Sequence, residues 1–284
     1  MDPLTWVALG DSYTAGVIVT AGETFEIPRD GCQRTTLAYP QVLARRLEEQ
    51  VELVDVSSGG ATIAHIAQHP QEPAGSQFPP LSTDPDYPYQ PVPPQIEAVS
   101  EKTDVITVGA GIATLEFLPM LMECITLGQD SGNRGAPGRD ALQDGLPARL
   151  AVTADEFSEM LAALHERAPF ARVITVGYPS IFPADAAAAS YDSPTQYLSL
   201  THGDLAWLRD EVLFPLNRLI EEATAASGDT FVDLAKVTSG HSASDRDRWI
   251  EGMLLDDFKP GLLLPNARGH AAVAQALQDA LLNS

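Results

Sequence analysis

The chain has 284 residues, of which 44% are hydrophobic and 20% are charged. These proportions are typical of a folded globular protein and exclude an intrinsically disordered one. The net charge of −22 disfavours nucleic acid and anionic membrane surfaces as partners, because both would repel the chain. The length suits one large α/β unit, so we expect a single domain over residues 1–284.

Cysteine use and the start of the chain bear on the cellular compartment. The two cysteines, Cys32 and Cys124, lie far apart, and no Cys or His spacing matches a zinc site. Strand-like sequence begins at Trp6, so we expect no signal peptide before it. No apolar run reaches the length of about 18 residues that a membrane span needs. We therefore expect a cytoplasmic protein that uses no metal or cofactor and binds a small molecule. Its oligomeric state stays open.

Five short apolar runs predict buried strands. They are rich in Val and Ile and nearly continuous, which is typical of a parallel sheet covered on both faces. The runs are Trp6–Leu9, Val51–Val56, Val105–Val108, Val173–Val176 and Phe231–Leu234. Helical periodicity is found at Tyr39–Gln50, Ala154–Arg167, Asp204–Ala226 and Ala267–Leu282. The alternation predicts a doubly wound α/β fold with its site at the carboxyl ends of the strands.

Two segments interrupt this alternation. Residues 69–94 are dense in Pro, Ser, Asp and Gln, and residues 128–147 are rich in Gly, Asp and Arg. Both are expected to be loop insertions. They are either plain surface excursions or a lid or pocket wall, since long loops in compact domains are often functional.

A cluster of small, turn-forming residues follows the first apolar run. It reads Gly10-Asp11-Ser12-Tyr13-Thr14-Ala15-Gly16. A short strand that ends in such a turn and presents a serine has the local geometry of an exposed nucleophile. Ser12 is therefore the candidate nucleophile, and Asp11 and Tyr13 are candidate pocket residues beside it.

A series of motifs, in order along nearly the whole chain, resembles the SGNH hydrolase (GDSL esterase/lipase) superfamily, in particular its actinobacterial esterase-like branch. The motifs are Gly10-Asp11-Ser12, Ser57-Ser58-Gly59-Gly60-Ala61-Thr62, Thr107-Val108-Gly109-Ala110-Gly111, Val176-Gly177-Tyr178-Pro179, Phe231-Val232-Asp233-Leu234, Gly240-His241 and Pro265-Asn266-Ala267-Arg268-Gly269-His270. The resemblance implies a flavodoxin-like three-layer α/β/α sandwich with a five-stranded parallel sheet. It also implies that Ser12 attacks an acyl carbonyl and that the amides of Ser12 and Gly60 stabilise the oxyanion.

The sequence departs from the family pattern at the catalytic positions. The family reads Gly-Gly-Asn-Asp where this chain has Gly111-Ile112-Ala113-Thr114, so Ala113 stands in place of the oxyanion asparagine. The final family motif reads Asp-x-x-His-Pro-Asn, and here Gly261 stands at the aspartate and Leu264 at the catalytic histidine. Leucine cannot accept a proton, and a serine without a base is a weak nucleophile at neutral pH.

A substitute base would have to come from another histidine. His241 closely follows the fifth strand, where loops rim the site, and is the preferred candidate, although a loop histidine that bonds backbone is the alternative. His65 lies near a helix start beside the second motif and is a weaker candidate. His65 and His69 lack the third ligand that a metal site would need. His270 matches a non-catalytic histidine of the family.

Three functions remain open. The first is an SGNH-type hydrolase or acyltransferase that acts through Ser12, with a non-standard base, on a small apolar acyl or ester compound. The second is a biosynthetic enzyme of the same fold that tailors or cyclises a molecule without ester hydrolysis. The third is a catalytically inactive binding protein. The apolar residues Ala113 and Leu264 favour an apolar ligand in each case.

Overall fold

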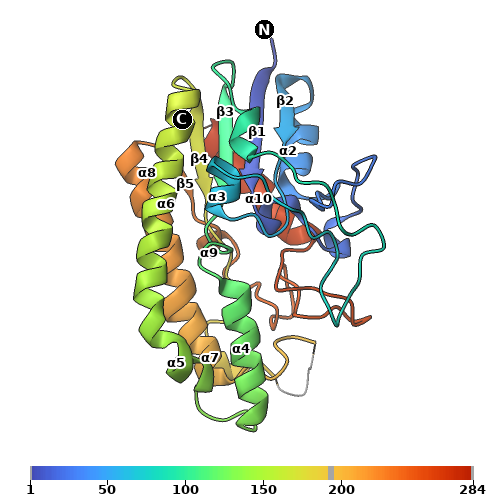
Figure 1. The fold of residues 1–284 in the computed structure, drawn as a ribbon, viewed down its shortest axis with the longest axis vertical. Helices are drawn as coiled ribbons and strands as arrows, with labels where there is room; N and C mark the ends of the chain where they lie inside the picture. Colours follow the sequence, from blue (N-terminus) through green and yellow to red (C-terminus); the bar gives the residue numbers. More distant parts are fainter. Residues whose placement is uncertain (1, 191–194, 283–284) are drawn as a thin grey trace.

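The computed structural model describes residues 2–190 and 195–282. Its strands form one parallel sheet in the order β2-β1-β3-β4-β5, shown in Figure 1. The strands are β1 (Leu4–Gly10), β2 (Val51–Asp55), β3 (Val105–Gly109), β4 (Arg172–Val176) and β5 (Thr230–Val232). The five predicted strands are confirmed, with ends that differ by at most two residues. The strand order is that of a flavodoxin-like fold.

Helices connect the strands and cover both faces of the sheet. They are α1 (Ser12–Ala15), α2 (Tyr39–Leu47), α3 (Ile63–Ala67), α4 (Phe117–Asp130), α5 (Pro137–Leu142), α6 (Leu146–Arg167), α7 (His202–Trp207), α8 (Phe214–Ser227), α9 (Leu234–Val237) and α10 (Ala267–Leu282). A π-helical stretch, Leu208–Leu213, joins α7 to α8. The predicted helix Asp204–Ala226 is therefore one helical run of three parts. Within the described residues, no helix has the length and apolar character needed to cross a membrane.

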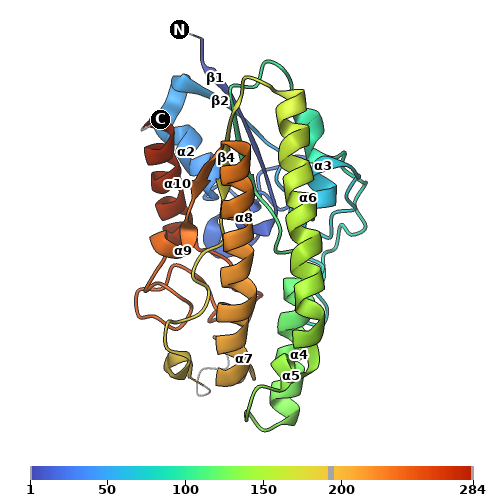
Figure 2. The same cartoon turned by 90° about the vertical axis from the view of Figure 1, so that its left-hand side faces the viewer.

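The two faces of the sheet bury two separate cores because neighbouring side chains of a strand point in opposite directions. Trp6 and Ala8 of β1 pack in a core with α2 and α10. Val7 and Leu9 of the same strand pack in a larger core with α3, α4, α6 and α8. Figure 2 shows α2 and α10 on one side of the sheet and α3 and α6 on the other. The predicted three-layer sandwich is confirmed.

Residues 128–147 differ from the expected loop because most of them are helical. The segment contains the end of α4, the whole of α5 and the start of α6. Pro137 stands in the first turn of α5, where its missing N–H is not needed. The carboxylate of Asp204 accepts hydrogen bonds from the backbone N–H groups of Gly138 and Arg139, which caps this helix. Pro137 and Gly138 here stand in the first turn of a helix, so the expectation of a loop from the composition of residues 128–147 was wrong.

Residues 69–94 are irregular, as expected, apart from isolated bridges such as Gln71 with Val92. Figure 1 shows this segment, α4 and the chain before α10 gathered beyond the carboxyl ends of the strands. Three stretches far apart in sequence therefore meet where the sheet presents its loops, which is where a site is expected in this class of fold.

Candidate active site

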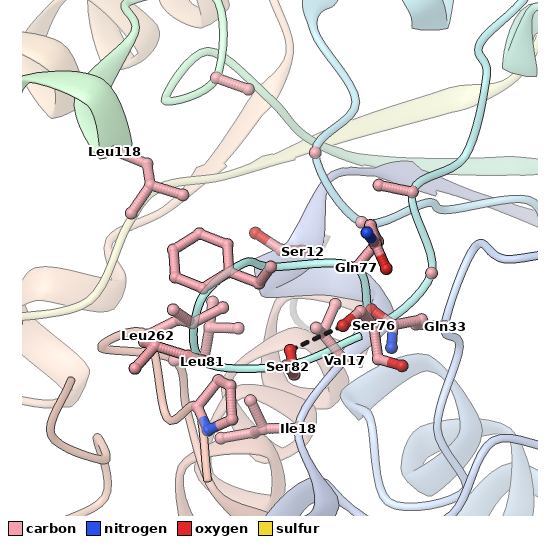
Figure 3. A pocket seen from close by; sticks show the side chains of 18 of the residues that line it. Ser12, Val17, Ile18, Gln33, Ser76, Gln77, Leu81, Ser82, Leu118 and Leu262 are labelled. Atoms are coloured by element: carbon pink, nitrogen blue, oxygen red, sulfur yellow. Dashed lines mark hydrogen bonds between the residues drawn. The ribbon is translucent and has the colours of Figure 1, made fainter. Parts of the chain in front are cut away.

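A cavity of about 610 Å³ lies at the carboxyl end of β1 and contains Ser12 in its lining. Its walls come from the turn after β1, from residues 59–60, from residues 74–82, from the start of α4 and from residues 259–264. Most of the lining is apolar, with Val17, Ile18, Phe78, Leu81, Phe117, Leu118, Leu121, Leu262 and Leu264 among the side chains. Figure 3 shows Ser12 among these residues. The cavity therefore suits a molecule with a large apolar part.

The turn after β1 fixes the position of Ser12. The Asp11 carboxylate accepts a hydrogen bond of 2.9 Å from the backbone N–H of Tyr13, which caps the short helix α1 that begins at Ser12. The backbone N–H of Asp11 donates to the carbonyl of Gly109 at the end of β3. Among the described residues, no partner hydrogen-bonds the Ser12 hydroxyl. The Ser12 hydroxyl is thus held in position but is not hydrogen-bonded to a general base in the described part of the chain.

Two backbone N–H groups of residues that line the cavity, those of Ser12 and Gly60, have no hydrogen-bond acceptor within the described part of the chain. A pair of such donors next to a nucleophile is the arrangement that stabilises a tetrahedral intermediate. Ala113 lines the same cavity and supplies a methyl group, so its side chain adds no third donor.

A buried hydrogen-bond network supports the Ser12 turn from below. The hydroxyl of Tyr178 donates to Asp11 Oδ2 at 2.6 Å and accepts from the backbone N–H of Ile112 at 3.0 Å. Burial raises the pKa of Asp11 to about 7, and the hydrogen bonds from Tyr178 and Tyr13 act in the opposite direction. Tyr178 thus ties the turn after β1 to the loop after β3.

A second buried side chain holds the same turn. The amide of Gln95 accepts from the N–H of Gly10 at 2.8 Å and donates to its carbonyl at 2.9 Å. Gln95 and Tyr178 have no site role in the sequence-based interpretation. Tyr178 stands in a family motif, which was a usable signal, whereas a single glutamine after a long loop carries no signal of its own.

The C-terminal wall of the cavity is apolar, including at Leu264, which the motif resemblance aligns with the catalytic histidine. Leu264 is 2% exposed and lines the cavity. Leu262 and Leu263 both adopt left-handed backbone conformations, with φ values of 53° and 57°. The hydroxyl of Tyr13 donates to the carbonyl of Leu263 at 3.2 Å, which links this wall to the Ser12 turn.

Gly261, which the motif resemblance aligns with the catalytic aspartate, has no space for a side chain. A Cβ at this residue would lie 2.3 Å from the backbone oxygen of Gly252. The wall therefore offers neither a proton acceptor at position 264 nor room for a carboxylate at position 261 without a backbone shift.

The structure places His241 outside the described lining of the cavity. Its ring stacks on Trp249, with centroids 3.5 Å apart and planes at 2°. Its Nδ1 lies 2.7 Å from the carbonyl oxygen of Asp247. A carbonyl can only accept, so Nδ1 carries the proton. These contacts match the alternative of a loop histidine that bonds backbone, and we assign it no base role.

His65 serves as part of a helix cap. Its Nδ1 accepts from the backbone N–H of Thr62 at 3.1 Å, and the Thr62 hydroxyl accepts from the N–H of His65, which together form the capping box of α3. The described residues hold no group of three or more His, Cys, Asp or Glu side chains that could bind a metal ion.

The lining as a whole is poor in groups that transfer protons. Its described residues include no histidine, aspartate or glutamate. Lys259 is the cationic residue of the described lining. The Nζ of Lys259 lies 2.8 Å from the carboxylate of Asp257 in an exposed ion pair. Of the residues singled out from sequence, the structure brings Ser12, Tyr13, Gly60, Ala113 and Leu264 to one cavity and places Asp11 directly beneath it.

Comparisons with known proteins show the family of this chain. The model of the GDSL-like Lipase/Acylhydrolase family matches residues 8–272. Lipase 2 of Streptomyces coelicolor is 32% identical over 98% of this chain and 86% of its own length. An esterase of Streptomyces scabiei is 28% identical, with the same coverage of 98% and 86%.

Solved structures share the fold. Phospholipase A1 from Streptomyces albidoflavus NA297 superposes with a TM-score of 0.73 at 19% identity, over 98% of this chain and 99% of that protein. The extracellular lipase from Streptomyces rimosus gives a TM-score of 0.69 at 18% identity, with the same coverage of 98% and 99%. With these matches, the chain belongs to the GDSL-like lipase/acylhydrolase (SGNH hydrolase) family.

Proposed function

We propose that this chain hydrolyses esters of apolar acyl groups, with Ser12 as the nucleophile and with solvent, rather than a histidine, as the proton acceptor. One observation carries the proposal. A single apolar cavity contains the unengaged Ser12 hydroxyl together with the free backbone N–H groups of Ser12 and Gly60. This combination can bind an acyl chain and polarise its carbonyl, while the lining supplies no side chain that would take the serine proton.

The reaction has two stages. Ser12 Oγ attacks the acyl carbon while its proton passes to hydroxide, and the carbonyl π electrons move to the oxygen, which the N–H groups of Ser12 and Gly60 stabilise. When the intermediate collapses, the bond to the alcohol oxygen breaks and the alkoxide takes a proton from water. Water then hydrolyses the acyl-serine ester, so that one water splits the substrate into an acid and an alcohol.

The expected rate is low but measurable. In serine hydrolases whose catalytic side chains have been removed, binding and the oxyanion hole alone retain about 10³–10⁴-fold acceleration over water. Each methylene that leaves water for an apolar wall contributes about 0.8 kcal/mol to binding. The apolar lining around Leu264 therefore favours long acyl chains through affinity, and the missing base limits the chemical step.

Covalent labelling tests the nucleophile directly. We expect a fluorophosphonate probe to label the peptide that contains Ser12, as detected by mass spectrometry, and expect slow cleavage of p-nitrophenyl esters that is absent in Ser12→Ala. Ser158→Ala is a matched control, because this exposed serine on α6 only bonds the carbonyl of Ala154 in its own helix. Equal, negligible hydrolysis by the native chain and Ser12→Ala, with no label on Ser12, would contradict the proposal.

A further inference from the structure

Residues 74–84, which we call the flap, form one wall of the cavity. Seven of the residues that line the cavity come from its first nine positions. At its tip, Phe78 and Ser82 exchange backbone hydrogen bonds of 3.0 and 2.9 Å, which close a tight turn. Figure 3 shows Leu81 and Leu262 on one side of the view and Gln33 and Gln77 on the other. The flap thus carries both apolar and polar side chains into the cavity.

The Asp84 carboxylate holds the base of the flap. Its side chain has 0% exposure and accepts from the backbone N–H of Ser76 at 2.8 Å, from the Ser76 hydroxyl at 3.0 Å and from the Tyr89 hydroxyl at 3.0 Å. The Arg29 guanidinium donates to both of its oxygens, at 2.8 and 3.2 Å. Burial acts to raise the pKa of Asp84, but these hydrogen bonds outweigh it and hold the pKa well below the usual range.

The flap is also docked on the segment around Gly31. The backbone N–H of Gly75 donates to the carbonyl of Gly31 at 3.1 Å. Gly75 has a φ of +58°, and a Cβ there would lie 2.3 Å from Asp84 Oδ2, so this close approach requires glycine. The contacts with Asp84, Arg29 and Gly31 together make the flap a fixed wall.

We propose that the flap sets the length of the apolar chain that the cavity accepts, with Asp84 as the positioning residue that holds Phe78 and Leu81 in the wall. Phe78 and Leu81 face the same cavity as Leu118 and Leu121 of α4. A chain between these walls gains affinity with each methylene until its end meets a wall that cannot move. The inference rests on the proposed function only in taking the natural chain to be an acyl group.

Displacement of a neutral fluorescent probe, N-phenyl-1-naphthylamine, by n-alkanols of increasing length tests this without any ester chemistry. In the native protein we expect affinity to rise about fourfold per methylene and then to stop at a definite length. Asp84→Asn replaces an acceptor with an amide nitrogen that faces the donors of Arg29 and Ser76, so the flap is released. We expect the alkanol length at which affinity stops rising to change by two or more carbons.

Asp86→Asn is the matched control. This neighbouring carboxylate is 56% exposed and also contacts Arg29, but it does not bond Ser76. We expect its length limit to equal that of the native protein. The readout is binding and not hydrolysis, so a failure of the hydrolase proposal would leave this test intact.

Phe78→Ala keeps the Asp84 contacts and removes only the ring, which makes the test independent of whether Asp84→Asn folds. We expect its limit to shift to longer alkanols. If Phe78→Ala keeps the native limit, or if a folded Asp84→Asn does so, the flap does not set the chain length.

Discussion

The two sides of the cavity differ in the chemical groups that they present to a bound molecule. On the N-terminal side, Ser12 and Gly60 have unpaired backbone N–H groups among the described residues, and the buried side chains of Tyr178 and Gln95 hold the turn at Ser12 in place. On the C-terminal side, Leu262 and Leu264 present hydrocarbon. In the proposed mechanism, an oxyanion site made of backbone does not depend on one side chain, whereas proton transfer depends on the identity of position 264. Nucleophile placement and proton transfer are thus separable in this fold.

The largest expected effect is on the pH dependence of the free energy of unfolding, and it comes from the buried carboxyl of Asp11 on the N-terminal side. The pKa of Asp11 is raised from 3.8 to about 7, so the folded state keeps a proton that the unfolded chain releases. The stability that this proton contributes is present below about pH 4 and is lost as the pH rises to 7. Its full size is on the order of 4 kcal/mol. Urea melts from pH 4 to 8 should show a flatter pH dependence in Asp11→Asn, and identical slopes would contradict this account.

The next effect adds a base to the C-terminal side. Leu264→His places an imidazole in the wall of the Ser12 cavity, and we expect ester hydrolysis to rise about 10²-fold, at the lower end of what general bases contribute. The gain is limited because Gly261 leaves no room for an orienting carboxylate. The double variant Ser12→Ala/Leu264→His is the control and should show no gain. An unchanged rate in a folded Leu264→His would show that proton transfer does not limit the reaction.

A third change weakens the support of the N-terminal side. Tyr178→Phe removes the donor to Asp11 and leaves the buried N–H of Ile112 without its acceptor. We expect a loss of about 2 kcal/mol in the free energy of unfolding, since a buried unpaired polar group costs roughly this amount. Tyr87→Phe, at a residue with 50% exposure, should be neutral. Equal stability of the two variants would remove Tyr178 from the supporting network.

The smallest effect restores a side-chain donor to the oxyanion site. Ala113→Asn should raise kcat by about 10-fold, less than the 10²–10³ that a native donor contributes, because the surrounding wall is not built to orient the amide. Ala113→Leu has a similar volume and no donor, so it should give no increase. Equal rates for the Asn and Leu variants would show that the backbone donors of Ser12 and Gly60 act alone.

The sequence was most informative where local pattern and structure coincide. Continuous apolar runs predicted the strands. The motifs also singled out Ser12, Gly60 and Leu264, and the structure brings all three into the lining of one cavity. Residues 69–94 were expected to be either a surface excursion or a pocket wall, and seven residues between positions 74 and 82 line the cavity.

The features that the sequence could not predict are contacts between distant parts of the chain. Tyr178 bonds a residue 167 positions away and Gln95 one 85 positions away, and no periodicity reports such pairs. His241 was expected at the rim from its distance along the chain after β5. Its side chain instead stacks on Trp249, a contact that depends on how the later loop folds back.

The pH dependence of Ser12 labelling by a fluorophosphonate tests the central claim most directly. With solvent as the proton acceptor, the labelling rate should rise about tenfold per pH unit from pH 5.5 to 9, while Leu264→His should level off above the pKa of an imidazole, about 6.5. Labelling of the native protein that reaches a plateau near neutral pH, and keeps that plateau in Asp11→Asn, would reveal a resident base and contradict the account.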